Sequence, residues 1–202
     1  MIKKKRTTYH HGNLAESLLD AVDNIAMKFG MEAVTLRACA KLVGVSPSSA
    51  FRHYSDKRDL MTAFAVRAFN QMAECMEKAS KRSVKAGDHA FLAVGLAYIT
   101  FALEKPALFR AMWNEETLYS GDETYQAASD HLASYLQGGF ADTIDDADPA
   151  DLSAEEVLAW SAVHGLANLM VDGALYRDKS IKMRQRRAKE VLEKLAPVFD
   201  PD

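Results

Sequence analysis

Apolar residues return at helical spacing along most of the chain, and the first such run lies between Leu14 and Phe29. Leucine, valine and isoleucine recur there every three or four positions, while glutamate, aspartate and lysine lie between them. This period predicts an amphipathic helix with one buried face, and Gly30 marks its end. No alternation of apolar and polar residues persists long enough to predict a strand, so we expect an all-α protein.

Two short helices are predicted next, because helix-capping residues occur at suitable spacings. The side-chain oxygen of Thr35 can cap a helix of about two turns, and Gly44 can end that helix in a left-handed conformation. Ser46 is a second N-cap, and Pro47 suits the first position of a third helix that should run to about Tyr54. Two short helices joined by a glycine turn predict a helix-turn-helix.

The rest of the chain predicts a larger helical body. Ser55 and Asp56 can cap a fourth helix, and Ser153 with Glu156 forms a capping box before a later one. Helices are expected at residues 56–82, 87–104, 106–113, 122–144, 153–176 and 181–196. The predicted organisation is an N-terminal three-helix helix-turn-helix domain within residues 1–60, followed by a larger helical domain at residues 61–202.

Charge is distributed unevenly over these two regions. Residues 1–60 carry ten Lys and Arg against six Asp and Glu, whereas residues 61–202 carry fifteen against twenty-two. A basic N-terminal region is typical of proteins that bind an acidic partner such as nucleic acid. Cys39 and Cys75 lack a CxxC or metal-ligand spacing, which predicts neither a disulfide framework nor a zinc site. Without a signal-peptide pattern or a run of membrane-span length, we expect a soluble cytoplasmic protein.

The helix-turn-helix also carries side chains that suit DNA. Ala40 and Gly44 are small enough to let the two helices approach closely. The next helix offers Ser48, Ser49 and Arg52, whose hydroxyl and guanidinium groups suit base edges and phosphates in a major groove. The alternative for Arg52 is a surface side chain that only increases solubility.

The segment from Tyr9 to Leu60 resembles the DNA-binding domain of TetR/AcrR-type transcriptional regulators. The HHGNL entry, the run VTLRACAKLVGVSPSSAFRHYSDK and the Asp-Leu pair that follows carry this resemblance. A second segment, AWSAVHGLANLMVDG at residues 159–173, is similar to the WHG-type C-terminal domain of one subgroup. Two positions depart from the family pattern. Phe51 stands where tyrosine is usual, and Ala50 replaces a larger aliphatic residue.

The resemblance implies a double-stranded operator as the partner and places the contacts on this chain. The third helix is expected to enter the major groove, and Lys57 matches a lysine that contacts phosphate. The basic residues before the first helix would add phosphate or minor-groove contacts, although a solvated tail is the alternative. The expected DNA-binding residues are Lys4, Lys5, Arg6, Thr35, Arg37, Pro47, Ser48, Ser49, Phe51, Arg52, His53 and Lys57.

The resemblance also implies a homodimeric repressor of a palindromic operator, released by an apolar or amphipathic small molecule bound in the helical body. The last two helices would form the dimer interface, through Ala159, Ser161, Ala162, Gly165, Ala167, Val191, Leu192 and Leu195. The expected effector-binding residues are Met72, Met76, Tyr98, Phe101, Met112, Trp113, Trp160 and His164. The alternative for His164 is a hydrogen-bonded histidine of the core or the interface.

Catalytic signatures are missing from the chain. It has no GxSxG, GxGxxG, P-loop or HExxH motif, so we expect neither an enzyme nor a cofactor. A metal site is not expected either, because His10 and His11 have no third ligand nearby. Three alternatives stay open: a regulator controlled by a protein partner, a helical interaction protein that does not bind DNA, and a helical enzyme without a known motif.

Overall fold

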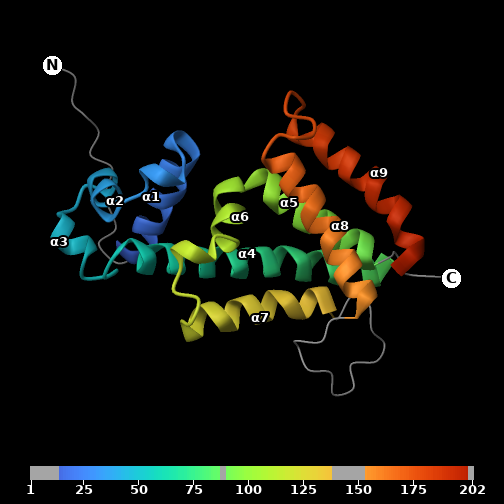
Figure 1. Ribbon diagram of the computed structural model, residues 1–202, viewed down its shortest axis with the longest axis horizontal. Coiled ribbons are helices and arrows are strands. Elements are labelled where there is room, and N and C mark those ends of the chain that lie inside the picture. The colour runs from blue at the N-terminus through green and yellow to red at the C-terminus, as the bar shows by residue number, and fades with distance from the viewer. Residues whose placement is uncertain (1–13, 87–89, 138–152, 200–202) are drawn as a thin grey trace.

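The computed structural model describes residues 14–86, 90–137 and 153–199, and the regular elements within these ranges are all helical. A small N-terminal head lies at one end of the long helix α4, and a larger body surrounds the rest of that helix (Figure 1). The elements are α1 (Leu14–Phe29), η1 (Met31–Ala33), α2 (Leu36–Val43), α3 (Pro47–Ala50), α4 (Lys57–Ala86), α5 (Ala90–Glu104), α6 (Pro106–Met112), η2 (Glu115–Thr117), α7 (Glu123–Gln137), α8 (Ala154–Val171) and α9 (Ile181–Phe199).

The head is built from α1, α2 and α3, as the sequence predicts. The apolar face of α1 packs against α2 and α3 and buries Leu18 and Val22 completely or nearly so. The backbone N–H of Ala38 donates to the Thr35 hydroxyl at 3.0 Å, which caps α2. Gly44 ends that helix with φ at +84°, a left-handed conformation that a side chain would strain. The predicted start and end of α2 are therefore confirmed.

The third helix is shorter than the prediction of a helix to about Tyr54. Its α-helical part ends at Ala50, and residues 51–53 form turns. The N–H of His53 donates to the Ala50 carbonyl at 3.0 Å, three residues back, so the last turn is tighter than an α-helix. This turn brings the Tyr54 ring into the head, where its hydroxyl donates to the Ala15 carbonyl at 3.3 Å. Burial of Tyr54 therefore ends α3 at Ala50, before the predicted end near Tyr54.

The long helix α4 runs from the head into the body and packs against α5, α6 and α7 (Figure 1). Phe64, Phe69, Met72 and Met76 on this helix are fully buried. The expected division of the chain at Leu60 lies in the first turn of α4, so head and body share one continuous helix. No single helix of the described ranges is long and apolar enough to cross a membrane, and only α5 with α6, bent by 110°, reaches the length and composition together.

The body helices begin close to the predicted positions but differ at some ends. The capping box of Ser153 and Glu156 is present at the start of α8. However, α8 ends at Val171 and not at residue 176, because Gly173 and Tyr176 adopt positive φ angles of 77° and 55°. Arg184 of α9 then donates to carbonyls of this connection, including that of Tyr176 at 3.0 Å. The short helices η1 and η2 were not expected, and residues 87–89 and 138–144 of two predicted helices lie outside the described ranges.

Candidate functional site

The surface of α3 and its surroundings is the first candidate site, because it displays most of the residues expected to bind DNA. Ser46 caps α3 by accepting the N–H of Ser49 at 3.2 Å, and its hydroxyl lies 2.8 Å from the hydroxyls of both Ser48 and Ser49. The three serines therefore form one hydrogen-bonded group at the N-terminus of the helix. The Ala50 side chain is fully buried, on the side of α3 that faces the head.

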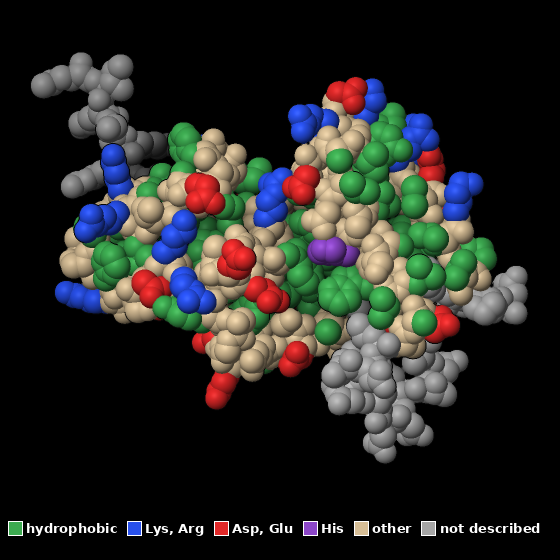
Figure 2. All heavy atoms as spheres, in the orientation of Figure 1, with side chains coloured by type: hydrophobic (Ala, Val, Ile, Leu, Met, Phe, Trp, Pro, Cys, Tyr) green, Lys and Arg blue, Asp and Glu red, His purple; other side chains and the backbone are tan. Residues whose placement is uncertain are grey.

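Most of the expected DNA-binding side chains are open to solvent. Phe51 is 46% exposed although it is a large apolar residue, and Arg52 beside it is also exposed. Figure 2 shows several Lys and Arg side chains over the end of the head that carries α2 and α3. Exposed residues are Thr35, Arg37, Pro47, Ser48, Phe51, Arg52 and His53, while Ser49 and Lys57 are partly buried. The expected contacts from Lys4, Lys5 and Arg6 lie outside the described residues.

An interior polar cluster in the body is the second candidate site. The Tyr98 hydroxyl of α5 lies 2.8 Å from Nδ1 of His164 on α8, and the Trp113 ring stands 4.8 Å from the His164 ring, centroid to centroid. The Trp160 ring lies 5.9 Å from that of Trp113, and Phe109 lies 5.8 Å from His164. The structure thus brings together four of the expected effector residues. We call Tyr98, Phe109, Trp113, Trp160, His164 and Asn168 the interior cluster.

The other four expected effector residues are core residues around this cluster. Met72, Met76 and Met112 are almost completely buried, and Phe101 is 3% exposed with the Lys105 ammonium 5.5 Å from its ring. Two cluster members were not expected to bind an effector. They are Phe109 and Asn168, and Asn168 lies four residues after His164, which puts both on one side of α8.

Hydrogen bonding determines the state of the histidine. Nε2 of His164 lies 2.7 Å from the amide nitrogen of Asn168, which can only donate, so with this amide orientation Nδ1 carries the ring proton. Burial lowers the pKa of His164 below its ordinary value, which keeps the ring neutral near pH 7. The structure therefore supports the interpretation of His164 as a hydrogen-bonded, partly buried histidine, whereas contact with an effector stays a prediction.

The two tryptophans of the interior cluster have unusual indole nitrogens. Both Nε1 atoms are buried, and neither has a hydrogen-bond partner among the described residues. Burial raises the pKa of Tyr98 well above its ordinary value, while hydrogen bonding from the indoles of Trp160 and Trp113 acts in the opposite direction, although neither indole reaches ordinary hydrogen-bond geometry. A buried N–H without a partner costs about 1 to 3 kcal/mol. The Tyr98 oxygen is therefore the acceptor toward which both indoles act, and the cluster is polar at its centre.

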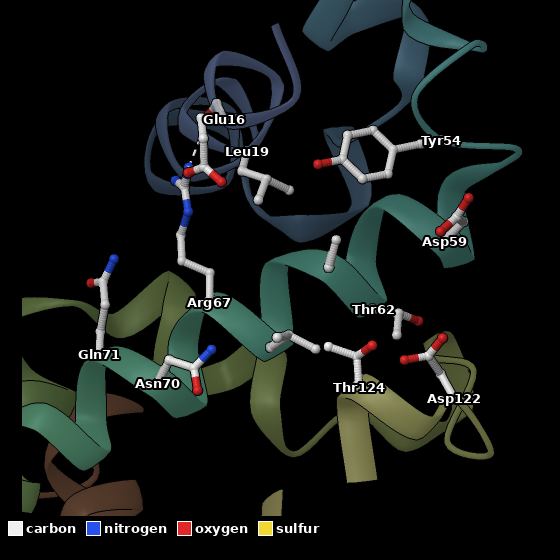
Figure 3. Close-up of a pocket in the computed structure, with 12 residues that line it drawn as sticks. Glu16, Leu19, Tyr54, Asp59, Thr62, Arg67, Asn70, Gln71, Asp122 and Thr124 are labelled. Atoms are coloured by element: carbon white, nitrogen blue, oxygen red, sulfur yellow. Dashed lines mark hydrogen bonds and ion pairs between the residues drawn. The ribbon is translucent and has the colours of Figure 1, made fainter. Parts of the chain in front are cut away.

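The junction between head and body is held by polar contacts on both sides of α4. Arg67 of α4 binds the carboxylates of Glu16 and Asp20 on α1, the second at 2.7 Å. Its side chain is only 15% exposed. Figure 3 shows Arg67 reaching toward Glu16 along one side of a pocket of about 450 Å³, with Tyr54 on the opposite side. The salt bridges of Arg67 therefore connect α1 of the head to α4.

A second contact joins the start of α4 to the connection after α6. The Arg58 guanidinium lies 4.5 Å from the centre of the Tyr119 ring and donates to the carbonyl of Leu118. The Tyr119 hydroxyl donates to Asp56 at 2.5 Å, and this hydrogen bond lowers the pKa of the Asp56 carboxyl. The head is thus fixed relative to the body at two separate points.

Helix α6 links the interior cluster to the head and to the end of α8. Trp113 follows directly after its last residue, and its first turns pack against α1 of the head. Arg110 on the same helix pairs with Asp172 at 3.2 Å and donates to the Val171 carbonyl at 3.1 Å, at the end of α8. A displacement of α6 would therefore change contacts at both the cluster and the head.

The surface of α8 and α9 contains exposed apolar side chains, which Figure 2 shows on the side of the body that carries these helices. They are Val157, Leu158, Leu169, Ile181, Val191 and Val198, each between 38% and 54% exposed. Gly165 is partly buried, and a Cβ atom there would meet nothing within 4 Å. Three residues expected in a dimer interface, Ala159, Ala167 and Leu192, are instead buried inside the subunit, because their side of each helix packs on α5. Their placement in the interface was wrong.

The described residues contain no group of three or more His, Cys, Asp or Glu side chains placed to hold a metal ion. Cys39 is buried and Cys75 partly buried, and both are free thiols. Burial raises the pKa of the Cys39 thiol to about 11, which makes it unreactive near neutral pH.

Comparison with known protein families gives two matches. Residues 18–64 match the bacterial regulatory proteins of the tetR family, and residues 91–194 match the tetracyclin repressor-like C-terminal domain. The chain is 26% identical over 179 residues to the uncharacterized HTH-type transcriptional regulator YobS of Bacillus subtilis (strain 168), and the match covers 84% of this chain and 85% of YobS.

Solved structures with the same fold cover nearly the whole chain. A protein with unknown function from Rhodococcus sp. RHA1 has a TM-score of 0.70 and 23% identity, and the match covers 92% of this chain and 96% of that one. The TetR family transcriptional regulator PfmR from Thermus thermophilus has a TM-score of 0.64 and 15% identity, with coverage of 89% and 96%. At these identities the likeness concerns the fold.

Proposed function

Because the chain belongs to the TetR family of bacterial regulatory proteins, and is therefore a DNA-binding transcription regulator and not an enzyme, we propose that it is a ligand-released repressor. In this proposal a homodimer binds a palindromic operator with its two heads, and a small molecule in the interior cluster releases it. Residues 1–60 are the DNA-binding unit and residues 61–202 the effector-binding and dimerisation unit.

The exposed surface of α3 is the observation that carries the DNA part of the proposal. Exposed Ser48 on α3, together with exposed Arg52 and His53 in the turn that follows it, suits the major groove, where such side chains reach base edges and phosphates. Lys57 lies at the N-terminus of α4 and is suited to a phosphate, because the helix dipole there also favours an anion. Two heads of a dimer would occupy successive grooves, roughly 34 to 36 Å apart.

Footprinting on the region upstream of the protein's own gene tests this part. We expect protection of a short inverted repeat, with two protected half-sites whose centres are about one helical turn apart. An unrelated fragment of the same length and base composition is the control. Uniform weak protection of both fragments, or none, would contradict operator recognition and would favour the alternative of a helical interaction protein.

The apolar surface of α8 and α9 supports the homodimer. Leu158, Gly165 and Leu169 follow one another at helical spacing on α8, and Val191 and Val198 are exposed on α9. Apolar residues exposed on two adjacent helices are typical of a contact that removes them from water. A two-fold axis would then pack the pair of helices against the same pair in the partner, in a four-helix arrangement.

The interior cluster supports an effector site in the body. It combines aromatic walls with a few polar groups, the composition that small-molecule sites usually have. Its link to α6, and that of α6 to α1, offers a physical path from a bound molecule to the head. The alternative is control by a protein partner, and measurement of operator affinity with and without a molecule that binds the cluster separates the two.

A further inference from the structure

We propose that the pocket at the junction of head and body binds a primary aliphatic amine, whose ammonium group pairs with Asp59 and Asp122. We call this space, which Arg67 and Tyr54 border on opposite sides in Figure 3, the junction pocket. None of its described lining residues belongs to the interior cluster. The inference therefore concerns a second binding site and does not depend on the proposed effector site.

The junction pocket has space for a small organic molecule. Its volume is about 450 Å³, and small-molecule sites usually enclose roughly 300 to 1,000 Å³. Leu19 and Tyr54 line it from the head, one side of α4 lines its length, and Thr124 of α7 lines it from the body (Figure 3). A molecule bound there would contact the head and the body at the same time.

Carboxylates outnumber cations around this space. Glu16, Asp59 and Asp122 border the pocket, and Arg67 is the only Lys or Arg among the described residues that line it. The Arg67 guanidinium is already bound to two carboxylates, those of Glu16 and Asp20. The excess negative charge therefore belongs to Asp59 and Asp122, and it favours a ligand with a positive charge.

The two aspartates have no cationic partner within the described ranges. One oxygen of Asp59 accepts the N–H of Ser55 at 2.7 Å, and one oxygen of Asp122 accepts the N–H of Tyr125 at 2.9 Å, at the starts of α4 and α7. The second oxygen of each carboxylate forms no hydrogen bond with the described residues. An ammonium group has three N–H donors and no acceptor, which suits two such oxygens.

The Tyr54 hydroxyl is influenced by the charges of the pocket. Burial raises the pKa of Tyr54 to about 12, the carboxylates of Glu16 and Asp59 add to this rise, and Arg67 opposes it. Negative charge has this effect on a phenol because it disfavours the phenolate. The same two carboxylates would attract a cation placed beside the ring.

The lining suits an organic cation better than a metal ion. Asp59 and Asp122 belong to no group of three or more His, Cys, Asp or Glu side chains placed to hold a metal within the described residues. Ala63 and Val66 line the same pocket, are only partly buried, and lie three residues apart on one side of α4. An alkyl chain attached to the ammonium group would cover these apolar side chains.

Three compounds with one chain length and different charges test the inference on the full chain: n-hexylamine, 1-hexanol and hexanoate. Amide NMR titrations of the isotope-labelled protein give each dissociation constant and show the place of binding through the signals of Asp59, Val66 and Thr124. Two ion pairs near the surface predict an amine that binds about 2-fold to about 30-fold more tightly than the alcohol. Hexanoate should bind more weakly than the alcohol because both aspartates repel it, and added salt should reduce both differences.

Removal of one charge at a time is the second arm of the experiment. In Asp122→Asn the amine should lose most of its advantage over the alcohol, while α7 keeps its cap, since asparagine caps a helix about as well as aspartate. Asp59→Asn should act in the same way and serves if the first variant fails to fold. Glu123→Gln is the matched control, because Glu123 is in the first turn of α7 and does not line the pocket, and the ratio should stay nearly unchanged.

Each contrary result overturns a separate part of the inference. Equal affinities of n-hexylamine and 1-hexanol overturn the preference for an amine, and tighter binding of hexanoate overturns the sign of the charge. An equal loss in Glu123→Gln and Asp122→Asn shows general attraction to an acidic surface and overturns the site. Displacement of n-hexylamine by an equimolar amount of Mg²⁺ shows a metal site instead. If none of the three compounds shifts the signals around the junction pocket, the pocket is not a binding site, and the proposed effector site at the interior cluster is unaffected.

Discussion

Replacement of Gly165 by leucine tests the proposed dimer directly, because the structure separates its effect inside the subunit from its effect on a partner. A Cβ atom at Gly165 meets nothing within 4 Å, so the subunit has space for a side chain there. The residue shares a side of α8 with the exposed Leu158 and Leu169. Within one subunit the substitution should therefore leave folding almost intact, while between two subunits it would fill the contact.

The size of the effect follows from packing. Overfilling a close helix contact costs about 1 to 3 kcal/mol, and a two-fold axis repeats the change once in each subunit. The dimer should thus lose about 2 to 6 kcal/mol, which raises the dissociation constant between about 30-fold and about 10⁴-fold.

Sedimentation equilibrium measures this constant, and urea denaturation of the same samples measures folding. Gly121→Leu is the matched control, because Gly121 is exposed near the start of α7 and a Cβ there also meets nothing within 4 Å. The control should dimerise like the unmodified protein. The reasoning is refuted if Gly165→Leu dimerises with unchanged affinity, or if the unmodified protein is a folded monomer at micromolar concentration.

Four further substitutions test the head and its junction. Arg52→Ala should weaken specific operator binding by about 1 to 3 kcal/mol, whereas Lys57→Ala should weaken binding to all sequences and reduce its salt dependence. Gel-shift titrations at several salt concentrations measure both effects. If the two variants behaved alike in these titrations, Arg52 would be a phosphate contact only. Gly44→Ala should cost about 1 to 2 kcal/mol in urea unfolding through backbone strain alone, and an unchanged midpoint would show that α2 ends differently. Tyr119→Phe removes the hydrogen bond that lowers the pKa of Asp56. The unmodified protein should therefore be more stable than the variant above the ordinary pKa of a carboxyl group, and should lose this extra stability as the pH falls through the lowered pKa of Asp56. Parallel profiles of unfolding free energy from pH 7 to 2 would contradict this.

The parts of the fold that depend on local chemistry could be predicted from the sequence. The caps at Thr35, Ser46 and Ser153 each accept the backbone N–H that their position implies, because a cap and its partner are three residues apart. The end of α3 could not be predicted in this way. It depends on the burial of Tyr54 against Ala15, a contact across 39 positions of the chain.

The interior cluster was predictable in composition but not in arrangement. Tyr98 and His164 are 66 positions apart, and no local pattern indicates that the tyrosine hydroxyl meets one ring nitrogen while Asn168 meets the other. Sequence patterns predict which side chains are buried more reliably than which polar atoms are satisfied.

Helix α4 has a mechanical consequence of its own. At 1.5 Å per residue its 30 residues form a lever about 45 Å long, with Lys57 at one end and Ala86 at the other. A pivot of about 5° at the Ala86 end would swing the Lys57 end by about 4 Å, and two such swings in opposite directions would alter the distance between heads by about 8 Å. That is roughly a quarter of the 34 to 36 Å between successive major grooves, so in the proposed dimer a tilt of a few degrees, accompanied by repacking around the buried Phe64 and Phe69, would be enough to move the two heads out of register with DNA.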